Sequence, residues 1–341
     1  MIHARPKTYG LPLIAAASHT GEVNAMKSLI RRLAFALFWV FGGLALCHSA
    51  SAQAAAPTES EVQTSSVADE PLPDVVTLMR DVESNQRKSE AVQKNYIYHS
   101  VETQQEFDSH GAVKKTEVVE SDHFWANGVP VRRVTRKNGK PLSADEITKE
   151  DEHIDKTSAK ANEKREKADD KGKQTDPRGN EEVTVSRLLE LGAFTNPRRV
   201  ELNGRPTVAV DFTGDPKAKT RNRAEEILRD LAGTAWIDEQ DHVLASVQGH
   251  FVNSFKIGAG LIASVQKDTR FSMTQVKVNE EVWLPAVIEA QGSFHALLFL
   301  GLNGRVHVTN SDYRKFRATS KVLPEMTRVP STSAPDALPQ P

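Results

Sequence analysis

The side chains that could act as nucleophiles do not have the spacing that a known catalytic reaction requires. The sequence contains no G-x-S-x-G nucleophile elbow, and Gly292-Ser293-Phe294-His295 lacks the second glycine of that motif. Gly258-Ala259-Gly260 lacks the third glycine and the βαβ context of a dinucleotide-binding loop. Glycine within a strand often marks a bend, so we expect a kink here, at a point where the sheet curls. We therefore assign no catalytic residue and expect the protein not to be an enzyme.

The candidate metal ligands are equally dispersed. The 11 histidines do not form the H-E-x-x-H motif of a zinc site. His242 and His250 are eight residues apart on one expected strand, which separates them by about 27 Å, so one ion cannot bind both without a bend. Asp238 and Asp241 stand at an expected turn, where aspartate favours hydrogen bonds to the local backbone over acid–base catalysis. We expect no metal ion and no cofactor.

The composition describes the kind of scaffold that these residues belong to. The chain has 341 residues, of which 38% are hydrophobic and 26% charged. These values are typical of a globular protein and exclude collagen-like, mucin-like and multi-span membrane classes. This length allows one large domain or two small ones, and a sizeable buried core.

The N-terminal region predicts a secretory signal peptide that begins at Met26. Basic residues (Lys27, Arg31 and Arg32) precede an apolar run, Leu33–Leu46, that is too short to span a bilayer comfortably. Ala50-Ser51-Ala52 then provides an A-x-A cleavage site before Gln53. We expect residues 1–25 to lie upstream of the natural start, and the mature protein to be periplasmic or secreted without a transmembrane segment.

Cleavage changes the charge and the cysteine content. The lone Cys47 follows Leu46 rather than the small residue that a lipoprotein signal needs, so we expect removal rather than lipidation. The chain from Gln53 then has no cysteine for a disulfide. It carries 39 bases and 44 acids, a net charge of −5, which does not favour binding to nucleic acid.

The expected domain organisation is one domain between two disordered ends. Residues 1–52 form the upstream and signal segment, 53–73 a disordered lead-in, and 319–341 a disordered tail. The domain covers 74–318 and contains a charged insertion at 145–182. Residues 145–182 hold 13 acids and 9 bases, which predicts either a solvated helix with i,i+4 ion pairs, over Asp145–Asp170, or a flexible insertion. Its role is either a solvated excursion or an arm that binds a partner.

The spacing of apolar residues predicts an α+β domain built on an antiparallel sheet of about ten strands. Helices are expected near 74–92, 183–193 and 223–231. Hairpin turns are expected at Gly111, Asn138-Gly139, Asn203-Gly204, Asn279-Glu280 and Asn303-Gly304, with separate strands at 282–289 and 294–300. Because strand twist curls a sheet of this size, we expect an unclosed β-barrel with helices covering its concave face.

The alternation of apolar and polar residues along the strands predicts which residues line a ligand cavity. In the strand 242–251, Val243, Ala245, Val247 and Phe251 share one face, and Leu244, Ser246, Gln248 and His250 the other. The candidate lining residues of the domain are Phe251, Phe271, Met273, Leu284 and Trp283. The alternation does not distinguish an open cavity from a filled hydrophobic core, so both interpretations stay open.

Two segments of the sequence resemble those of a known superfamily. They are Gly233–Leu244 (G-T-A-W-I-D-E-Q-D-H-V-L) and Glu281–Pro285 (E-V-W-L-P), each a strand next to a turn. With the signal peptide, the first helix and the strand meander of residues 75–317, they resemble the LolA/LolB-like carriers that sort outer-membrane lipoproteins. The resemblance implies an unclosed barrel with helical lids that holds acyl chains in an apolar cavity.

These observations support two hypotheses of function. The first is a periplasmic binding or carrier protein that shelters a lipid or the acyl chain of a lipoprotein. The alternative is an envelope regulatory module that docks on a protein partner through 145–182 without transporting a ligand.

Overall fold

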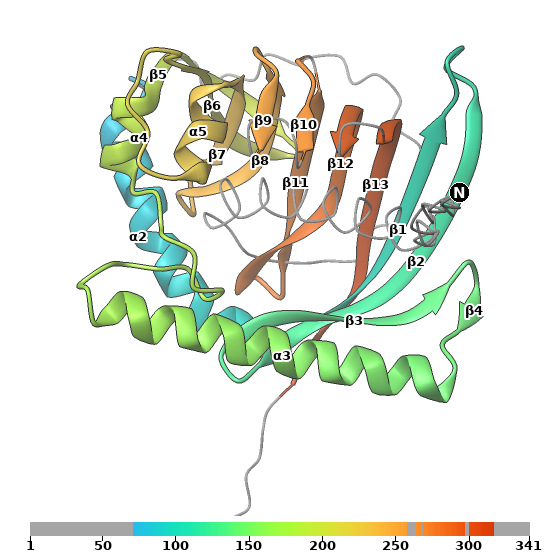
Figure 1. Cartoon of the computed structure of the whole chain (residues 1–341). Coiled ribbons are helices and arrows are strands. Elements are labelled where there is room, and N and C mark those ends of the chain that lie inside the picture. Colours follow the sequence, from blue (N-terminus) through green and yellow to red (C-terminus); the bar gives the residue numbers. More distant parts are fainter. Residues whose placement is uncertain (1–70, 258–262, 268, 297–299, 317–341) are drawn as a thin grey trace, which may run out of the picture.

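The computed structural model describes residues 71–257, 263–267, 269–296 and 300–316. The expected signal peptide and the Gly258-Ala259-Gly260 kink lie outside these residues. The described strands form one antiparallel sheet with the order β4-β3-β2-β1-β13-β12-β11-β8-β7-β6-β5, to which β10 and β9 are added beside β12 (Figure 1). Its two end strands, β4 and β5, are not paired with each other, so the sheet stays open.

Four described helices accompany thirteen strands. The helices are α2 (Val75–Gln93), α3 (Ala144–Asp169), α4 (Val185–Leu191) and α5 (Arg223–Arg229). The strands are β1 (Tyr96–Phe107), β2 (Val113–Ala126), β3 (Val129–Lys137), β4 (Lys140–Pro141), β5 (Gly192–Leu202), β6 (Arg205–Gly214), β7 (Leu231–Asp238), β8 (Val243–Phe251), β9 (Phe255–Ile257), β10 (Ala263–Val265), β11 (Arg270–Val278), β12 (Val282–Ala296) and β13 (Leu300–Lys315). The predicted class, an α+β protein with an unclosed antiparallel sheet, is confirmed.

Asparagine–glycine pairs make three of the hairpin turns. Asn127-Gly128, Asn138-Gly139 and Asn203-Gly204 all have positive φ angles, between 49° and 76°. Two consecutive left-handed residues match the twist of the flanking strands, and asparagine and glycine tolerate that conformation best. The turns predicted at Asn138, Asn203 and Asn279 are therefore confirmed.

The turn predicted at Asn303-Gly304 is wrong, because both residues lie inside β13. Gly304 pairs with Gly292 of β12 and with Glu106 of β1. A side chain at Gly304 would approach the backbone oxygen of Gln105 to 2.5 Å, so glycine here permits close packing of strands rather than a turn. The separate strands predicted at 282–289 and 294–300 are likewise one continuous β12 up to Ala296.

Helices α2, α4 and α5 pack on one face of the sheet. Their apolar side chains, including Leu78, Met79, Val82, Leu188 and Leu228, form a buried cluster with Val208, Val210 and Phe212 of β6 and Ile237 of β7. We call this face the helix face. Directly opposed residues of antiparallel strands point to the same side of a sheet. The pairing register therefore identifies which residues belong to the helix face on each strand from β6 to β3.

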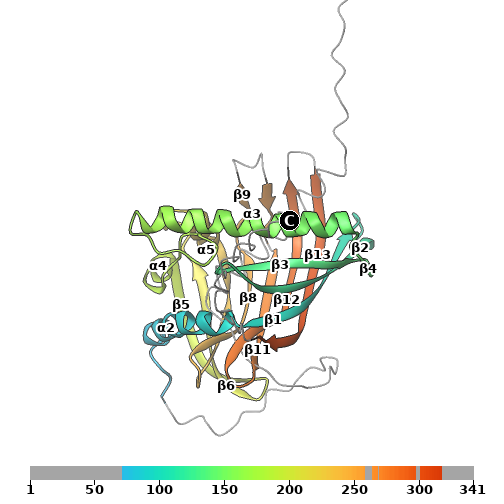
Figure 2. The ribbon, with the colours of Figure 1, turned by 90° about the horizontal axis from the view of Figure 1, so that it is seen from below.

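Helix α3 lies on the other face, against β3 (Figures 1 and 2). Val131 and Phe124 oppose each other and pack with Ile154 and Ala161 of α3. The neighbouring pair His123 and Arg132 points to the helix face. The outer side of α3 carries the i,i+4 ion pairs Lys156–Glu152 and Lys167–Glu163. The charged stretch up to Asp169 is thus a helix with solvated ion pairs, one of the predicted alternatives.

A polar cluster connects the two sequence segments that resemble the carrier superfamily, Gly233–Leu244 and Glu281–Pro285. Trp283 Nε1 donates a hydrogen bond of 2.7 Å to Asp241, and Lys277 and Arg205 lie 3.0 and 3.1 Å from the same carboxylate. Burial raises the pKa of Asp241, but the hydrogen bonds from Trp283 and Lys277 outweigh it, and the pKa lies below its ordinary value. The cluster fixes the β7–β8 turn against the start of β12.

Replacement of Asp241 by asparagine is expected to lower the free energy of unfolding by about 1–3 kcal/mol at pH 7, because Lys277 and Arg205 each lose one of their two partner carboxylates and keep only Glu280 and Asp238. The folded-state pKa is lowered, so the stabilisation is complete above the ordinary value of 3.8 and is lost as pH falls through the folded value. Urea unfolding at pH 7 and pH 3 measures both. Asp312→Asn, at a residue whose side chain is 65% exposed, is the control. An equal deficit at both pH values would contradict the assignment.

Candidate functional site

An apolar row crosses the helix face from β6 to β13. Val210, Ala235, Val247, Met273, Ile288 and Val308 are paired in direct succession across six neighbouring strands. At the usual strand spacing, this row is about 24 Å long. We call it, together with the row beside it, the apolar wall. It ends at Glu102 of β1, which is paired with Val308.

The second row of the wall is built around two opposed glycines. It contains Phe212, Gly233, Gly249, Phe271, Ala290 and Val306, again paired in direct succession. A side chain at Gly249 would lie 2.7 Å from the ring of Phe271. The glycines therefore let the aromatic ring lie flat against the backbone, and no side chain projects from the middle of the row.

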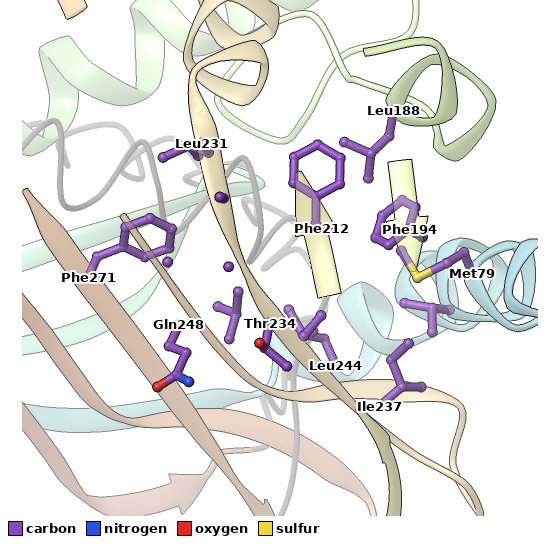
Figure 3. A pocket seen from close by; sticks show the side chains of 16 residues that line it. Met79, Leu188, Phe194, Phe212, Leu231, Thr234, Ile237, Leu244, Gln248 and Phe271 are labelled. Carbon is purple, nitrogen blue, oxygen red and sulfur yellow. The ribbon is translucent and has the colours of Figure 1, made fainter. Parts of the chain in front are cut away.

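The helices close over the β6–β8 end of the wall and leave a small apolar cavity. Met79 of α2 and Leu188 of α4 lie beside Phe194 and Phe212 of the sheet (Figure 3). Val82 of α2 and Phe271 of β11 also line the cavity. The cavity has a volume of about 20 Å³. That is space for about one water molecule, so the protein's own side chains fill this part of the interior.

The structure divides the five predicted lining residues into two groups. Phe251, Phe271 and Met273 belong to one buried cluster on the wall, together with Ile227 of α5 and Val265 of β10. Trp283 and Leu284 belong to another cluster, with Tyr96 and Val278, at the other end of the strands. Phe271 also lines the cavity.

A bulge in β8 changes the predicted facing of the first residues of that strand, whereas the facing predicted from Ser246 to Phe251 is confirmed. Trp236 pairs with Ser246 and Ile237 with Leu244, so Ala245 has no opposite residue. Leu244 therefore shares a face with Val247, contrary to the strict alternation expected from the sequence. The helical spacing of residues 74–92 and 183–193 predicted that these helices cover the sheet, but Met79, Val82 and Leu188 were not among the predicted lining residues.

A buried polar cluster stands where the wall ends. Arg132 donates a 2.8 Å hydrogen bond to Glu102, whose side chain is 7% exposed. The rings of Tyr98 and His123 stack with centroids 4.8 Å apart. Tyr98, His123 and Arg132 are directly paired across β1, β2 and β3 and so lie on the helix face.

Burial and nearby cations keep this cluster's titratable groups in fixed states. Burial, followed by the positive charges of Arg132 and Arg178, holds the pKa of His123 well below its ordinary value, so the imidazole is neutral at pH 7. Burial lowers the pKa of Arg178 to about 10 and raises that of Tyr98. The cluster thus presents guanidinium groups and neutral rings at the polar end of the wall.

An ion pair holds α4 against α5 beside the cavity. Arg187 donates to both carboxylate oxygens of Glu225, over 2.9 and 2.8 Å, and also bonds Glu190. Glu225 is 3% exposed, and the hydrogen bond from Arg187 lowers the pKa of its carboxyl group. Such a two-point contact fixes the relative orientation of the two helices.

Replacing Arg187 by methionine leaves the buried charge of Glu225 without its fork of donors, so α4 is expected to detach more often. Amide hydrogen exchange of Val185–Leu191 should accelerate about tenfold relative to the unmodified protein. The matched control is Lys167→Met, which breaks a solvated ion pair on α3. Unchanged exchange in α4 would show that the pair does not hold this helix.

The described residues contain no group of three or more histidine, cysteine, aspartate or glutamate side chains placed to hold a metal ion. No helix in the described part of the chain is long and apolar enough to cross a membrane. The arrangement on the helix face offers apolar contact surface with a polar border.

No protein-family model and no curated protein matches the chain. Among solved structures, the chain is similar to a domain from Vibrio parahaemolyticus named for outer membrane lipoprotein sorting. The identity is 8%, the match covers 72% of this chain and 94% of that chain, and the TM-score is 0.34.

Two further structures are similar over most of their length. A LolA superfamily protein from Nitrosomonas europaea is 9% identical, over 69% of this chain and 93% of that chain, with a TM-score of 0.28. A DUF1329 family protein from Desulfovibrio piger is 7% identical, over 71% and 92%, with a TM-score of 0.27. The resemblance to the LolA-like superfamily is thus met again among solved structures. Because these TM-scores lie below 0.5, no function is transferred from them.

Proposed function

We propose that this chain is an exported binding protein of the carrier type, which shelters the acyl chain of a lipoprotein or another lipid against the apolar wall. The observation that carries the proposal is the unbroken apolar row from Val210 to Val308 on an open sheet. A row of this length matches an extended acyl chain, and its contact area would supply the binding free energy. The predicted signal peptide supports export.

Ligand entry requires α2 and α4 to move away from the wall, because the cavity of about 20 Å³ has no room for an acyl chain. Among the side chains that the structure describes, three partly exposed polar contacts join α2 to the β7–β8 turn and to α4. They are Asn85 Nδ2 to the Asp241 carbonyl at 3.1 Å, Asp81 to His242 at 3.1 Å, and the Val185 amide to Glu83 at 3.3 Å. A bound chain would replace the apolar contacts that Met79 and Val82 give up.

We assign the predicted lining residues to different parts of the site. Phe271 and Met273 are in the wall itself and contact the ligand, and Phe251 supports them from the same cluster. Trp283 and Leu284 close the other end of the strands. The buried cluster of Arg132, Tyr98 and His123 would lie next to the ligand's polar group.

Adjacent residues of β12 provide the test. Ile288 belongs to the wall, opposite Met273, whereas Val287 points to the other face, opposite Thr274. Ile288→Ser is expected to weaken binding of the fluorescent fatty acid cis-parinarate about fivefold, because an apolar contact is lost. Val287→Ser makes the same chemical change on the other face and should leave binding unchanged.

Circular dichroism and thermal unfolding verify that both variants are folded. Val308→Thr is a second substitution in the apolar wall, and it changes the side chain less than Ile288→Ser does. Absence of saturable binding by the unmodified protein would refute the proposed function. An equal effect of the two β12 substitutions would show that the ligand does not contact the wall.

A further inference from the structure

A groove of about 740 Å³ lies across the sheet between β6 and β13, and it shares Phe212, Gly233, Gly249 and Phe271 with the lining of the apolar cavity. Its polar lining residues are Asp211, Thr213, Thr234, Gln248, His250, Arg270, Ser272, Glu289, Gln291 and Arg305. All of these alternate with the residues of the apolar wall along their strands. They therefore point to the face of the sheet opposite the helix face.

The pairing register arranges these side chains in two rows. One row contains Thr213, Ala232, His250, Arg270, Gln291 and Arg305, paired in direct succession. The other contains Asp211, Thr234, Gln248, Ser272, Glu289 and His307. The first row holds three basic side chains and no acid, so the charges of the groove are segregated by row.

The two acids of the groove are already engaged by neighbours. Asp211 accepts hydrogen bonds from Asn196, Arg198 and Thr234, over 2.8–3.0 Å. Glu289 accepts from Arg305 at 2.7 Å, and His307 lies 2.9 Å from the same oxygen. These bonds hold the pKa of both carboxyl groups below their ordinary values. Both acids stand near the ends of their row and leave its middle without a negative charge.

The middle of the groove has donors that the protein does not use. Arg270 and His250 are directly opposed and exposed, and Gln291 is the next residue along the row. Within the described part of the chain, no hydrogen bond or ion pair involves these three side chains, nor those of Gln248 and Ser272 in the other row. An unpaired guanidinium beside an imidazole, an amide and a hydroxyl forms a set of donors for an oxyanion.

We propose that this groove binds the phosphate or carboxylate group of a soluble, hydroxyl-bearing molecule, with Arg270 and His250 on the anion and Gln248, Ser272 and Gln291 on neighbouring oxygens. Two uncommitted basic residues are fewer than the roughly four to eight that recognition of an anionic membrane surface requires. The polar side chains of the groove point to the other face from the apolar wall, so substitutions of these side chains test the groove separately from the wall.

Calorimetric titration of the purified chain with inorganic phosphate and with glucuronate tests the proposal, with glucose as the uncharged comparison. Arg270→Gln is expected to weaken binding of both anions about tenfold, and His250→Gln severalfold. Arg270→Lys keeps the charge but loses the fork, so its affinity should be intermediate. The control is Arg314→Gln, at a residue whose side chain is 61% exposed outside the groove.

No binding of either anion, or equal losses in Arg270→Gln and Arg314→Gln, would overturn the proposal. Vesicles of phosphatidylglycerol distinguish a lipid headgroup from a soluble anion. Binding that depends on Arg270 for vesicles but not for phosphate or glucuronate would also overturn it. Fatty-acid binding should be unaffected by Arg270→Gln, so a failure of this site does not bear on the apolar wall.

Discussion

The register of one antiparallel sheet governs both faces of this protein. Six strands are paired without a shift where they cross the middle of the sheet, and each pairing places like side chains beside each other. An offset of one residue in any strand would move an apolar side chain into the polar groove and a polar one into the wall. The separation of an apolar wall from a groove with basic side chains therefore depends on that register.

Local signals predicted the hairpins and helices, and long-range packing decided the remainder. Asn138-Gly139 and Asn203-Gly204 need only their own backbone preferences, so the sequence was sufficient to place those turns. Gly304 has the same dipeptide context but opposes Gly292 in the sheet, which no local rule reveals. The bulge at Ala245 likewise depends on the partner strand, and it exchanged the faces of Leu244 and its neighbours.

The sequence predicted that the candidate site is apolar, but it did not predict the volume of its cavity. Phe271 and Met273 were recognised as apolar positions of one sheet face, and the structure places both in the wall. Whether that face encloses space depends on Met79, Val82 and Leu188, which fill most of it. In this structure the helices occupy part of the position that we propose for the ligand. Binding must then exchange protein contacts for ligand contacts, so affinity is set by the difference between them.

The most direct measurement is a native mass spectrum of the purified protein, recorded as isolated and after incubation with palmitate or a diacylated lipopeptide. The account predicts a one-to-one adduct with the mass of a lipid, released when the protein is unfolded by acid. A spectrum that shows only the bare chain under every one of these conditions would contradict the claim that the wall shelters an acyl chain.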